Sequence, residues 1–330
     1  MMIAVLPALL AIPSLAAAED FYAGKTIKII IGFTAGGGFD ANARLLARHL
    51  GRHIPGEPTV IVLNAPGAGS ATAIVRLDVN LPTDGTVIDG FNFGLIGNSL
   101  LQPDKIGIDF RRYAWIGSIS QDVTTCYVWR GDGPNSVAEM QAKGPYRFGS
   151  AALGTSDDIN TKILRRVFGV DISQITGYGG SAEVRLAIER GEIDGDCGTW
   201  SSVPEDWTKS AKFHPVLRTA TSLPEGMPPS VPYILDLAPS EAARKIIRFL
   251  VADGDLGRPY IVSRAVPADR IRTLQKAFAE TMADQQFLAD AKSLRLPVSP
   301  TTGEDAAKAV EQFYATPPDI IAAARKIVAE

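Results

Sequence analysis

Apolar and polar residues recur in blocks along this chain, and a typical block is a buried run, a glycine turn and an amphipathic segment. Residues 26–31 are β-branched apart from Lys28, which predicts a strand buried on most of its surface. Glycines at 36–38 permit backbone conformations closed to other residues, and leucines then recur at helical spacing up to Leu50. Asp40 stands where the N-cap of this helix is expected. The first block therefore predicts a strand, a glycine turn and a helix.

The same order of strand, turn and helix returns in the second half of the chain. Buried runs predict further strands over residues 58–64, 86–92, 113–120, 124–130, 146–150, 172–177, 193–199 and 258–263. Helices are predicted after residue 70 through Arg76 and over 159–168, 182–190, 241–251, 268–282 and most of 303–328. Strands joined by helical crossovers imply an α/β fold with parallel sheets. Two similar lobes with facing loops would form a cleft.

Length and composition agree with two domains and limit the possible functions. The 330 residues are 46% hydrophobic and 21% charged, which is enough to bury a sizeable core. The formal net charge of -3 gives no basic footprint of the kind that nucleic-acid binders show. An anionic ligand is compatible with this charge, because net charge does not fix the local field of a cleft.

The first 18 residues have the pattern of a signal peptide. An apolar run from Ile3 to Leu15 is followed by alanines at 16–18, which fits cleavage before Glu19, although no Lys or Arg precedes the run. No later segment is apolar for long enough to span a bilayer. We therefore expect the mature chain to be soluble and exported to the periplasm.

The glycine turn also predicts chemistry. Free backbone N–H groups at a helix N-terminus, placed beyond the carboxyl end of a strand, favour an anion. The spacing in GGGFDA disagrees with both the dinucleotide motif G-x-G-x-x-G and the P-loop motif G-x-x-x-x-G-K-[ST]. The turn at residues 65–70 predicts a second site of this kind, with Ser70 or Thr72 as the helix cap. The alternative interpretation is a plain strand-to-helix turn.

The sequence gives little support for a catalytic site. His49 and His53 have the spacing of a zinc helix, but HLGRH lacks the Glu of H-E-x-x-H, so two solvated histidines at a helix end are expected. No G-x-S-x-G motif is present. Asp194 and Asp196 alternate along a strand and should face opposite sides, and no second carboxylate cluster is expected near the aspartates at 157–158. We therefore expect no catalytic residues, no metal and no cofactor.

Four segments together resemble a known family, the periplasmic solute-binding proteins of tripartite tricarboxylate transporters, also called the Bordetella-uptake-gene family. The segments are IIIGFTAGGGFDANARLLARHL, VLNAPGAGSATA, PTDGTVI and TGYGGSAEVRLAIERGEIDGD. The resemblance spans most of the mature chain and implies a two-lobed type II periplasmic-binding-protein fold. The first lobe would comprise residues 19–122 and 264–330, and the second lobe residues 123–263 with the crossing strands.

The resemblance also implies which residues contact a ligand. A small carboxylate would be held between the lobes by backbone N–H groups, hydroxyls and bridging waters. The residues carried over are Ala35, Gly36, Gly37, Asp40, Gly69, Ser70, Thr155, Ser156, Gly179, Gly180, Thr199, Trp200 and Ser201, with Asp40 ordering the first turn.

This chain departs from the family pattern at two places. Asp157 and Asp158 would repel an anionic ligand unless they point outward. Trp200 either offers a flat apolar wall, which would favour an aromatic or longer acid, or packs at a strand end.

The chain has two cysteines, Cys126 and Cys197, which are compatible with one disulfide in an oxidising compartment or with two buried thiols. In the implied fold their strands lie side by side, and this favours the disulfide.

The leading hypothesis is an exported, monomeric protein that captures a small mono-, di- or aromatic carboxylate. It would deliver this ligand to the permease subunits of a tripartite tricarboxylate-type membrane transporter. The alternatives are an enzyme, such as a hydrolase or lyase, and a ligand-sensing domain on the same two-lobed fold. Turnover of a bound acid would favour the enzyme, whereas binding without turnover would favour the transport protein.

Overall fold

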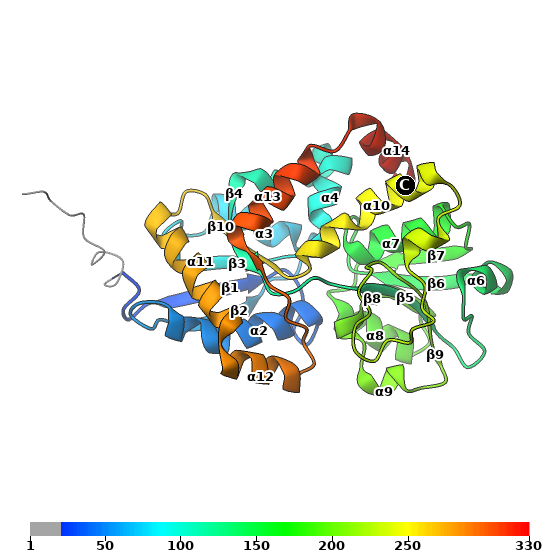
Figure 1. Cartoon of the computed structure of the whole chain (residues 1–330), viewed down its shortest axis with the longest axis horizontal. Coiled ribbons are helices and arrows are strands. Elements are labelled where there is room, and N and C mark those ends of the chain that lie inside the picture. Colours follow the sequence, from blue (N-terminus) through cyan, green and yellow to red (C-terminus); the bar gives the residue numbers. More distant parts are fainter. Residues whose placement is uncertain (1–20, 330) are drawn as a thin grey trace, which may run out of the picture.

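The computed structural model describes residues 21–329, so the predicted signal peptide lies outside the described residues. Two sheets, each flanked by helices, form two lobes, and the chain crosses between them (Figure 1). The expected α/β class is confirmed, but both sheets are mixed where parallel sheets were expected. The reason is that the crossing strands enter each sheet antiparallel to its βαβ units.

The first sheet has six strands, in the order β11 (Thr301–Thr302), β4 (Tyr113–Ser118), β10 (Pro259–Ser263), β3 (Val87–Gly90), β1 (Thr26–Ile31) and β2 (Thr59–Asn64). β1 pairs in parallel with β2 and β3, whereas β10 is antiparallel to β3 and β4. The helices around this sheet are α2 (Gly38–Leu50), α3 (Ala71–Val79), α11 (Ala268–Ala283), α12 (Gln285–Ser293) and α13 (Gly303–Tyr314).

The second sheet has five strands, in the order β7 (Ile172–Thr176), β6 (Tyr146–Ser150), β8 (Gly195–Thr199), β5 (Thr124–Trp129) and β9 (Phe213–Arg218). β6 is parallel to β7 and β8, and β5 is antiparallel to β8 and β9. The helices of this lobe are α6 (Val137–Lys143), α7 (Ser156–Arg166), α8 (Ser181–Glu189), α9 (Glu205–Thr208) and α10 (Glu241–Val251) (Figure 1).

Several elements join the two lobes. α4 (Gly94–Leu101) and α5 (Pro103–Ile106) follow β3, and α4 contacts both α7 and α13. The C-terminal helix α14 (Pro318–Val328) packs on α10 and α7 of the second lobe, although the predicted boundary assigns it to the first lobe. β10 pairs within the first sheet, although residues 123–263 are assigned to the second lobe. The predicted lobe boundaries stay a prediction.

Each lobe has its own apolar core, which fixes the strand ends that face the other lobe. In the first lobe, Ile29, Leu45 and Phe278 come from β1, α2 and α11 and are almost fully buried together. In the second lobe, a core between the sheet and α7, α10 and α14 contains Cys126 and Cys197, which a disulfide joins across β5 and β8. Burial of these apolar side chains is the main stabilising contribution.

Two helix starts differ from the sequence-based prediction. α7 begins at Ser156, three residues before the predicted start, so Asp157 and Asp158 lie in its first turn and not in a loop. The N-cap of α2 is Gly37 and not Asp40. Asp40 is the third residue of the helix, and its Oδ2 accepts the backbone N–H of Gly36 at 2.9 Å, so it orders the turn from inside the helix.

Ser70 also makes no side-chain cap for α3, contrary to one of the predicted possibilities. Its Oγ instead accepts the backbone N–H of Asn92 at 2.9 Å and donates to the carbonyl of Gly69. The hydroxyl is therefore used to join two loops of the first lobe.

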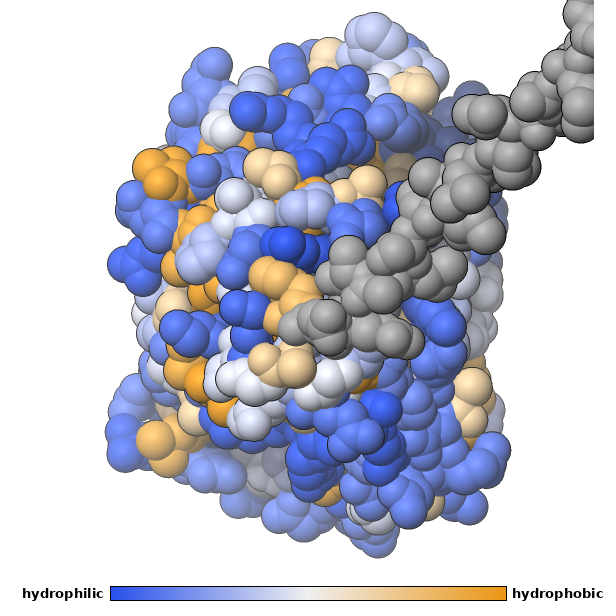
Figure 2. All heavy atoms as spheres, turned by 90° about the vertical axis from the view of Figure 1, so that its left-hand side faces the viewer, coloured by the Kyte–Doolittle hydropathy of each residue, from blue (hydrophilic) through white to orange (hydrophobic). Residues whose placement is uncertain are grey.

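The end of the first lobe is mainly polar at its surface, with apolar residues in small scattered groups (Figure 2). Over residues 21–329, no helix combines the length and the apolar character that crossing a membrane would require.

Candidate ligand-binding cleft

A cavity of about 50 Å³ lies between the lobes, at the ends of strands from both sheets. Its walls contain the N-terminal turns of three helices, α2 from the first lobe and α7 and α8 from the second. The lining residues are Phe33, Gly37, Gly38, Phe39, Asn92, Ala151, Ser156, Asp157, Ser181, Val184, Asp196, Gly198, Thr199, Ser202 and Arg258. Helix N-termini favour negative charge, so their convergence makes this cavity the candidate ligand site.

The N-terminal turn of α2 approaches the second lobe closely because it begins with glycine. A Cβ atom on Gly38 would lie 2.2 Å from Ser202 Oγ and 2.9 Å from Arg258 Nη2, so a larger residue does not fit without displacement. The backbone N–H of Gly38 donates to Ser181 Oγ at 3.4 Å. The glycine turn predicted from the sequence therefore serves the close approach of two lobes.

Asp40 holds the α2 turn in place. Its carboxylate accepts hydrogen bonds from Gly36, Arg44 and Asn64, all between 2.9 and 3.0 Å. Burial opposes ionisation, but these hydrogen bonds outweigh it and lower the pKa of Asp40. Asp40 is thus a fully satisfied, ionised structural group.

Arg258 is the buried cation of the cavity. It stands immediately before β10, is 2% exposed, and pairs with Asp122 across 3.0 Å between Nη2 and Oδ2. Nη2 also donates to the hydroxyls of Thr199 and Ser201, at 3.1 and 3.2 Å. The guanidinium lies 4.3 Å from the ring centre of Phe39.

The Arg258 guanidinium has N–H donors that are not used within the described chain. Nε and Nη1 are buried and have no hydrogen-bond partner among the described residues. Burial raises the pKa of its partner Asp122 to about 6, with Arg258 and Ser201 opposing the rise. A buried guanidinium with free N–H groups is a strong site for a carboxylate, because charge-assisted hydrogen bonds are the strong ones.

The second lobe contributes two carboxyl groups to the same cavity. Asp157 Oδ2 accepts the backbone N–H of Ala151 at 2.7 Å, and burial raises the pKa of Asp157 to about 6. Asp196 on β8 is 4% exposed, and burial raises its pKa well above the usual range, with the nearby Asp157 adding to the rise. The fold thus brings the single carboxyl group of Asp196 close to Asp157, which the sequence spacing does not indicate.

The lobes touch each other around the cavity. Thr34 N donates to the carbonyl of Gly179 at 2.8 Å, and Arg185 donates to the carbonyls of Gly36 and Ser202 at 3.3 and 2.9 Å. Asn92 also exchanges hydrogen bonds with Ser156 across the lobes. The structure is therefore a closed arrangement in which both lobes wall the site.

The residues carried over from the family occupy different places. Gly37, Ser156 and Thr199 line the cavity, and Ser201 contacts it through Arg258. The others are not among the residues that line it: Ala35, Gly36, Asp40, Gly69, Ser70, Thr155, Gly179, Gly180 and Trp200. Their role as ligand contacts stays a prediction.

Two of these neighbours have clear structural tasks. Gly69 packs against Thr155, because a Cβ atom there would lie 2.3 Å from Thr155 Cγ2. Trp200 is buried beside Phe213, and its Nε1 donates to the carbonyl of Glu225 at 3.0 Å. Of the two interpretations of Trp200, packing at a strand end agrees with these contacts.

Sequence reasoning missed the charged groups of the site. The apolar pattern predicts Arg258 only as the first residue of a strand, and it presents Asp196 only as one of two alternating aspartates. An Arg before the apolar run PYIVS and an Asp inside a buried strand are signals, because buried charges need partners. The sequence does not show which partners the fold brings to them.

The histidine pair is structural in a way that differs from the expectation. His49 is 5% exposed and not solvated, and its Nε2 lies 3.0 Å from Asp290 Oδ2. His53 Nε2 lies 2.8 Å from Asp284 Oδ2. These pairs tie α2 and the turn after it to α12.

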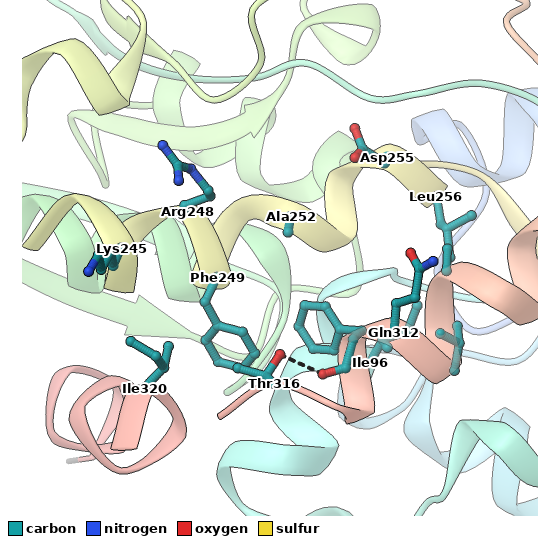
Figure 3. A pocket seen from close by; sticks show the side chains of 13 residues that line it. Ile96, Lys245, Arg248, Phe249, Ala252, Asp255, Leu256, Gln312, Thr316 and Ile320 are labelled. Atoms are coloured by element: carbon teal, nitrogen blue, oxygen red, sulfur yellow. Dashed lines mark hydrogen bonds between the residues drawn. The ribbon is translucent and has the colours of Figure 1, made fainter. Parts of the chain in front are cut away.

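A larger cavity, of about 440 Å³, lies elsewhere, between α10, α13, α14 and the one-turn segment η6 (Ala252–Leu256). Figure 3 shows its side chains, which are mostly apolar, with Phe249 stacked on Phe313 at 4.8 Å. Among its described lining residues there is no buried charged atom without a partner. Its chemistry therefore points less clearly to an anion than that of the smaller cavity.

Comparisons with known proteins agree with the sequence-based resemblance. No family model matches the chain. A curated UPF0065 protein of Agrobacterium vitis is 25% identical over 200 residues, which is 59% of this chain and 57% of the relative, so the match spans little more than half of that relative.

Solved structures match over most of the chain. The periplasmic binding protein BugD has a TM-score of 0.74 and 20% identity, covering 94% of this chain and 99% of BugD. MatC of Rhodopseudomonas palustris, with bound malate, has a TM-score of 0.71 and 15% identity. The match covers 92% of this chain and 99% of MatC. Another R. palustris protein, Rpa4515, solved with adipate, has a TM-score of 0.72 and 17% identity, covering 92% and 97%. The chain has the fold of these periplasmic binding proteins, and the predicted resemblance is confirmed.

Proposed function

We propose that this chain is a periplasmic solute-binding protein of the tripartite tricarboxylate transporter type. It captures a small organic carboxylate in the cavity between its lobes and delivers it to the permease subunits of a membrane transporter. The signal peptide would direct export and would be cleaved before Glu19. The observation that carries the proposal is the buried Arg258, which lines a cavity together with three helix N-termini and whose Nε and Nη1 have no hydrogen-bond partner among the described residues.

The physical basis of capture is closure around the anion. Each charge-assisted hydrogen bond contributes roughly 1.5–3 kcal/mol, so several together outweigh the desolvation of a carboxylate only when both lobes supply donors. Direct contacts such as Thr34 to Gly179 hold the closed arrangement. A closed form that depends on the ligand is a two-state signal that a permease can sense.

The likeness to binding proteins solved with malate and adipate supports a small acid as the ligand class. It does so through the shared fold, because the identities of 15% and 17% are too low to carry individual ligand contacts. The charged groups of this chain's own cavity therefore decide the finer specificity.

Thermal-shift measurements on residues 19–330 would test the proposal, with a panel of mono-, di- and tricarboxylates and amino acids. A ligand at 100 times its Kd should raise the free energy of unfolding by about 2.7 kcal/mol. Ser181→Phe, which fills the cavity, should abolish the shift. Ser173→Phe is the matched control, since Ser173 is exposed on β7 and does not line the cavity.

Each outcome has a defined meaning. A shift that Ser181→Phe removes and Ser173→Phe keeps, with the acid recovered unchanged, supports binding and delivery. Consumption of the acid would favour the enzyme alternative. No shift with any compound, for folded protein freed of carried-over ligand, would contradict the proposed function.

A further inference from the structure

Two carboxyl groups from separate elements share one wall of the cavity. Asp157 is in the first turn of α7 and Asp196 is on β8, and both line the cavity. In each, Oδ1 is buried and has no hydrogen-bond partner among the described residues. Asp196 is 4% exposed, so it is a nearly buried polar group with a free acceptor at the candidate site.

Three other acids have a cation beside them, of which Asp158 and Asp122 are buried and Asp194 is half-buried. Asp158 pairs with Lys162 at 3.0 Å, Asp122 with Arg258 at 3.0 Å, and Asp194 with Arg147 at 3.1 Å. Among residues 21–329, no Lys, Arg or His nitrogen forms an ion pair with Asp157 or Asp196 at a distance of 4 Å or less. Arg185 attracts Asp196 from a distance, but its guanidinium donates to backbone carbonyls.

The charged side chains of the cavity are therefore divided between two sides. Arg258 is the cation and lies beside the α2 N-terminus, while Asp157 and Asp196 are the acids on the second-lobe side, where the N-terminal turns of α7 and α8 also supply backbone donors. Resting on the proposed function, we infer that the ligand carries an ammonium group as well as a carboxylate, as amino acids and other aminated acids do. The carboxylate contacts Arg258, and the ammonium lies against Asp157 and Asp196.

A plain dicarboxylate fits this division less well. Its second carboxylate would lie against Asp157, which is ionised at neutral pH, and like charges at close range repel each other. An ammonium satisfies both free acceptors and removes the cost of burying an unpaired charge. Burial raises the pKa of Asp157 to about 6, so at neutral pH this group is available as an anion for the ammonium.

The test compares ligands that differ only by the amino group. Isothermal titration calorimetry on residues 19–330 would use L-alanine with propionate, 4-aminobutyrate with butyrate, and L-glutamate with glutarate. We expect at least one aminated acid to bind at least tenfold more tightly than its deaminated partner. Asp196→Asn and Asp157→Asn should each reduce that preference at least tenfold.

Asp194→Asn is the matched control. Asp194 lies two residues from Asp196 but pairs with Arg147 and does not line the cavity, so the preference should be unchanged. If deaminated acids bind as well as or better than their partners, the inference is overturned while the proposed function stands. If no acid of either kind binds, the proposed function fails as well.

The pH dependence gives a second readout that needs no variant. The charged and titratable groups that face the two acids are Asp158 on α7, Arg185 on α8 and Tyr127 on β5, with Arg258 and Asp122 across the cavity. Affinity for an aminated acid should rise about tenfold from pH 5 to pH 7, with proton release, as Asp157 ionises. Affinity for a deaminated acid should fall over the same range. An aminated acid that binds more tightly at pH 5 would overturn the inference.

Discussion

Each lobe places an aspartate in the first turn of a helix whose N-terminus lines the cavity, and the two aspartates have opposite roles. Asp40 in α2 and Asp157 in α7 each accept a backbone N–H from the loop before the helix, at 2.9 and 2.7 Å. Asp40 also accepts hydrogen bonds from the side chains of Arg44 and Asn64. Asp157 keeps Oδ1 without a partner.

The difference shows how one local pattern serves two purposes. The hydrogen bonds to Asp40 lower its pKa against the effect of burial, so the charge stabilises the turn. Burial dominates at Asp157 and raises its pKa to about 6, so the same group costs stability when ionised. An acid held at such a cost at a cavity wall is typical of a functional site.

The largest expected effect concerns the support beneath the second-lobe acids. Asp196 is next to Cys197, whose disulfide to Cys126 spans 71 residues of sequence. In the loop-entropy account, removing such a link costs about 4 kcal/mol. Urea unfolding of the Cys126→Ala, Cys197→Ala double variant should show this loss, and reductant should destabilise only the parent protein. A loss below about 1 kcal/mol would show that strand pairing alone supports Asp196.

The next effect sharpens the contrast at Asp40. Asp40→Ala leaves the Asn64 amide and the Gly36 N–H without their acceptor, so the free energy of unfolding should fall by about 2–3 kcal/mol. Urea denaturation at pH 7 measures this loss. Asp157→Ala is the comparison, and an equal loss there would remove the proposed distinction between the two aspartates.

A smaller effect of opposite sign is expected at the second-lobe acid. Asp157→Asn keeps an acceptor for the Ala151 N–H but removes a buried charge. At pH 7 the free energy of unfolding should rise by about 1–2 kcal/mol. Chemical denaturation of the ligand-free variant gives the number, and a clear destabilisation would mean that the charge of Asp157 supports the fold.

The smallest effect is a slope in pH. Between the unfolded pKa of about 3.9 and the folded pKa of about 6, Asp157 binds more protons in the folded state than in the unfolded state. Its contribution is therefore fully present below pH 4 and is lost as the pH rises through 6, by roughly 1 kcal/mol per pH unit. Asp40 has the opposite sign, with its contribution lost on acidification below the unfolded pKa. Unfolding from pH 3 to 8 should show a flatter profile between 4 and 6 for Asp157→Asn than for the parent protein.

The sequence predicts the parts of this comparison that depend on local periodicity. The strands at 26–31 and 146–150 and the helix at 241–251 have the predicted bounds, because apolar spacing and turn residues are local signals. The predicted start of α7 is three residues late, because the polar residues SDD are typical of a loop although they form the first helical turn. The sequence therefore predicts Asp157 in a loop, whereas it lies in the first turn of a helix.

The charges of the site could not be predicted in the same way. Arg258 reaches the cavity because the chain returns from the second lobe at that point, and Asp196 approaches Asp157 because β8 pairs beside β6. Both are consequences of long-range register. The glycine turn indicates the end of the sheet at which the cavity lies, but the partners of a buried charge depend on how the two lobes meet.

The most direct test of the whole account is a crystal structure of residues 19–330 with the tightest-binding acid from the panel. The ligand carboxylate should lie in the cavity between the lobes, about 2.7–2.9 Å from Arg258 Nε or Nη1, with an ammonium at the same distance from Asp157 or Asp196. A ligand bound in the apolar cavity between α10 and α13, or one in the cleft that leaves Arg258 untouched, would contradict it.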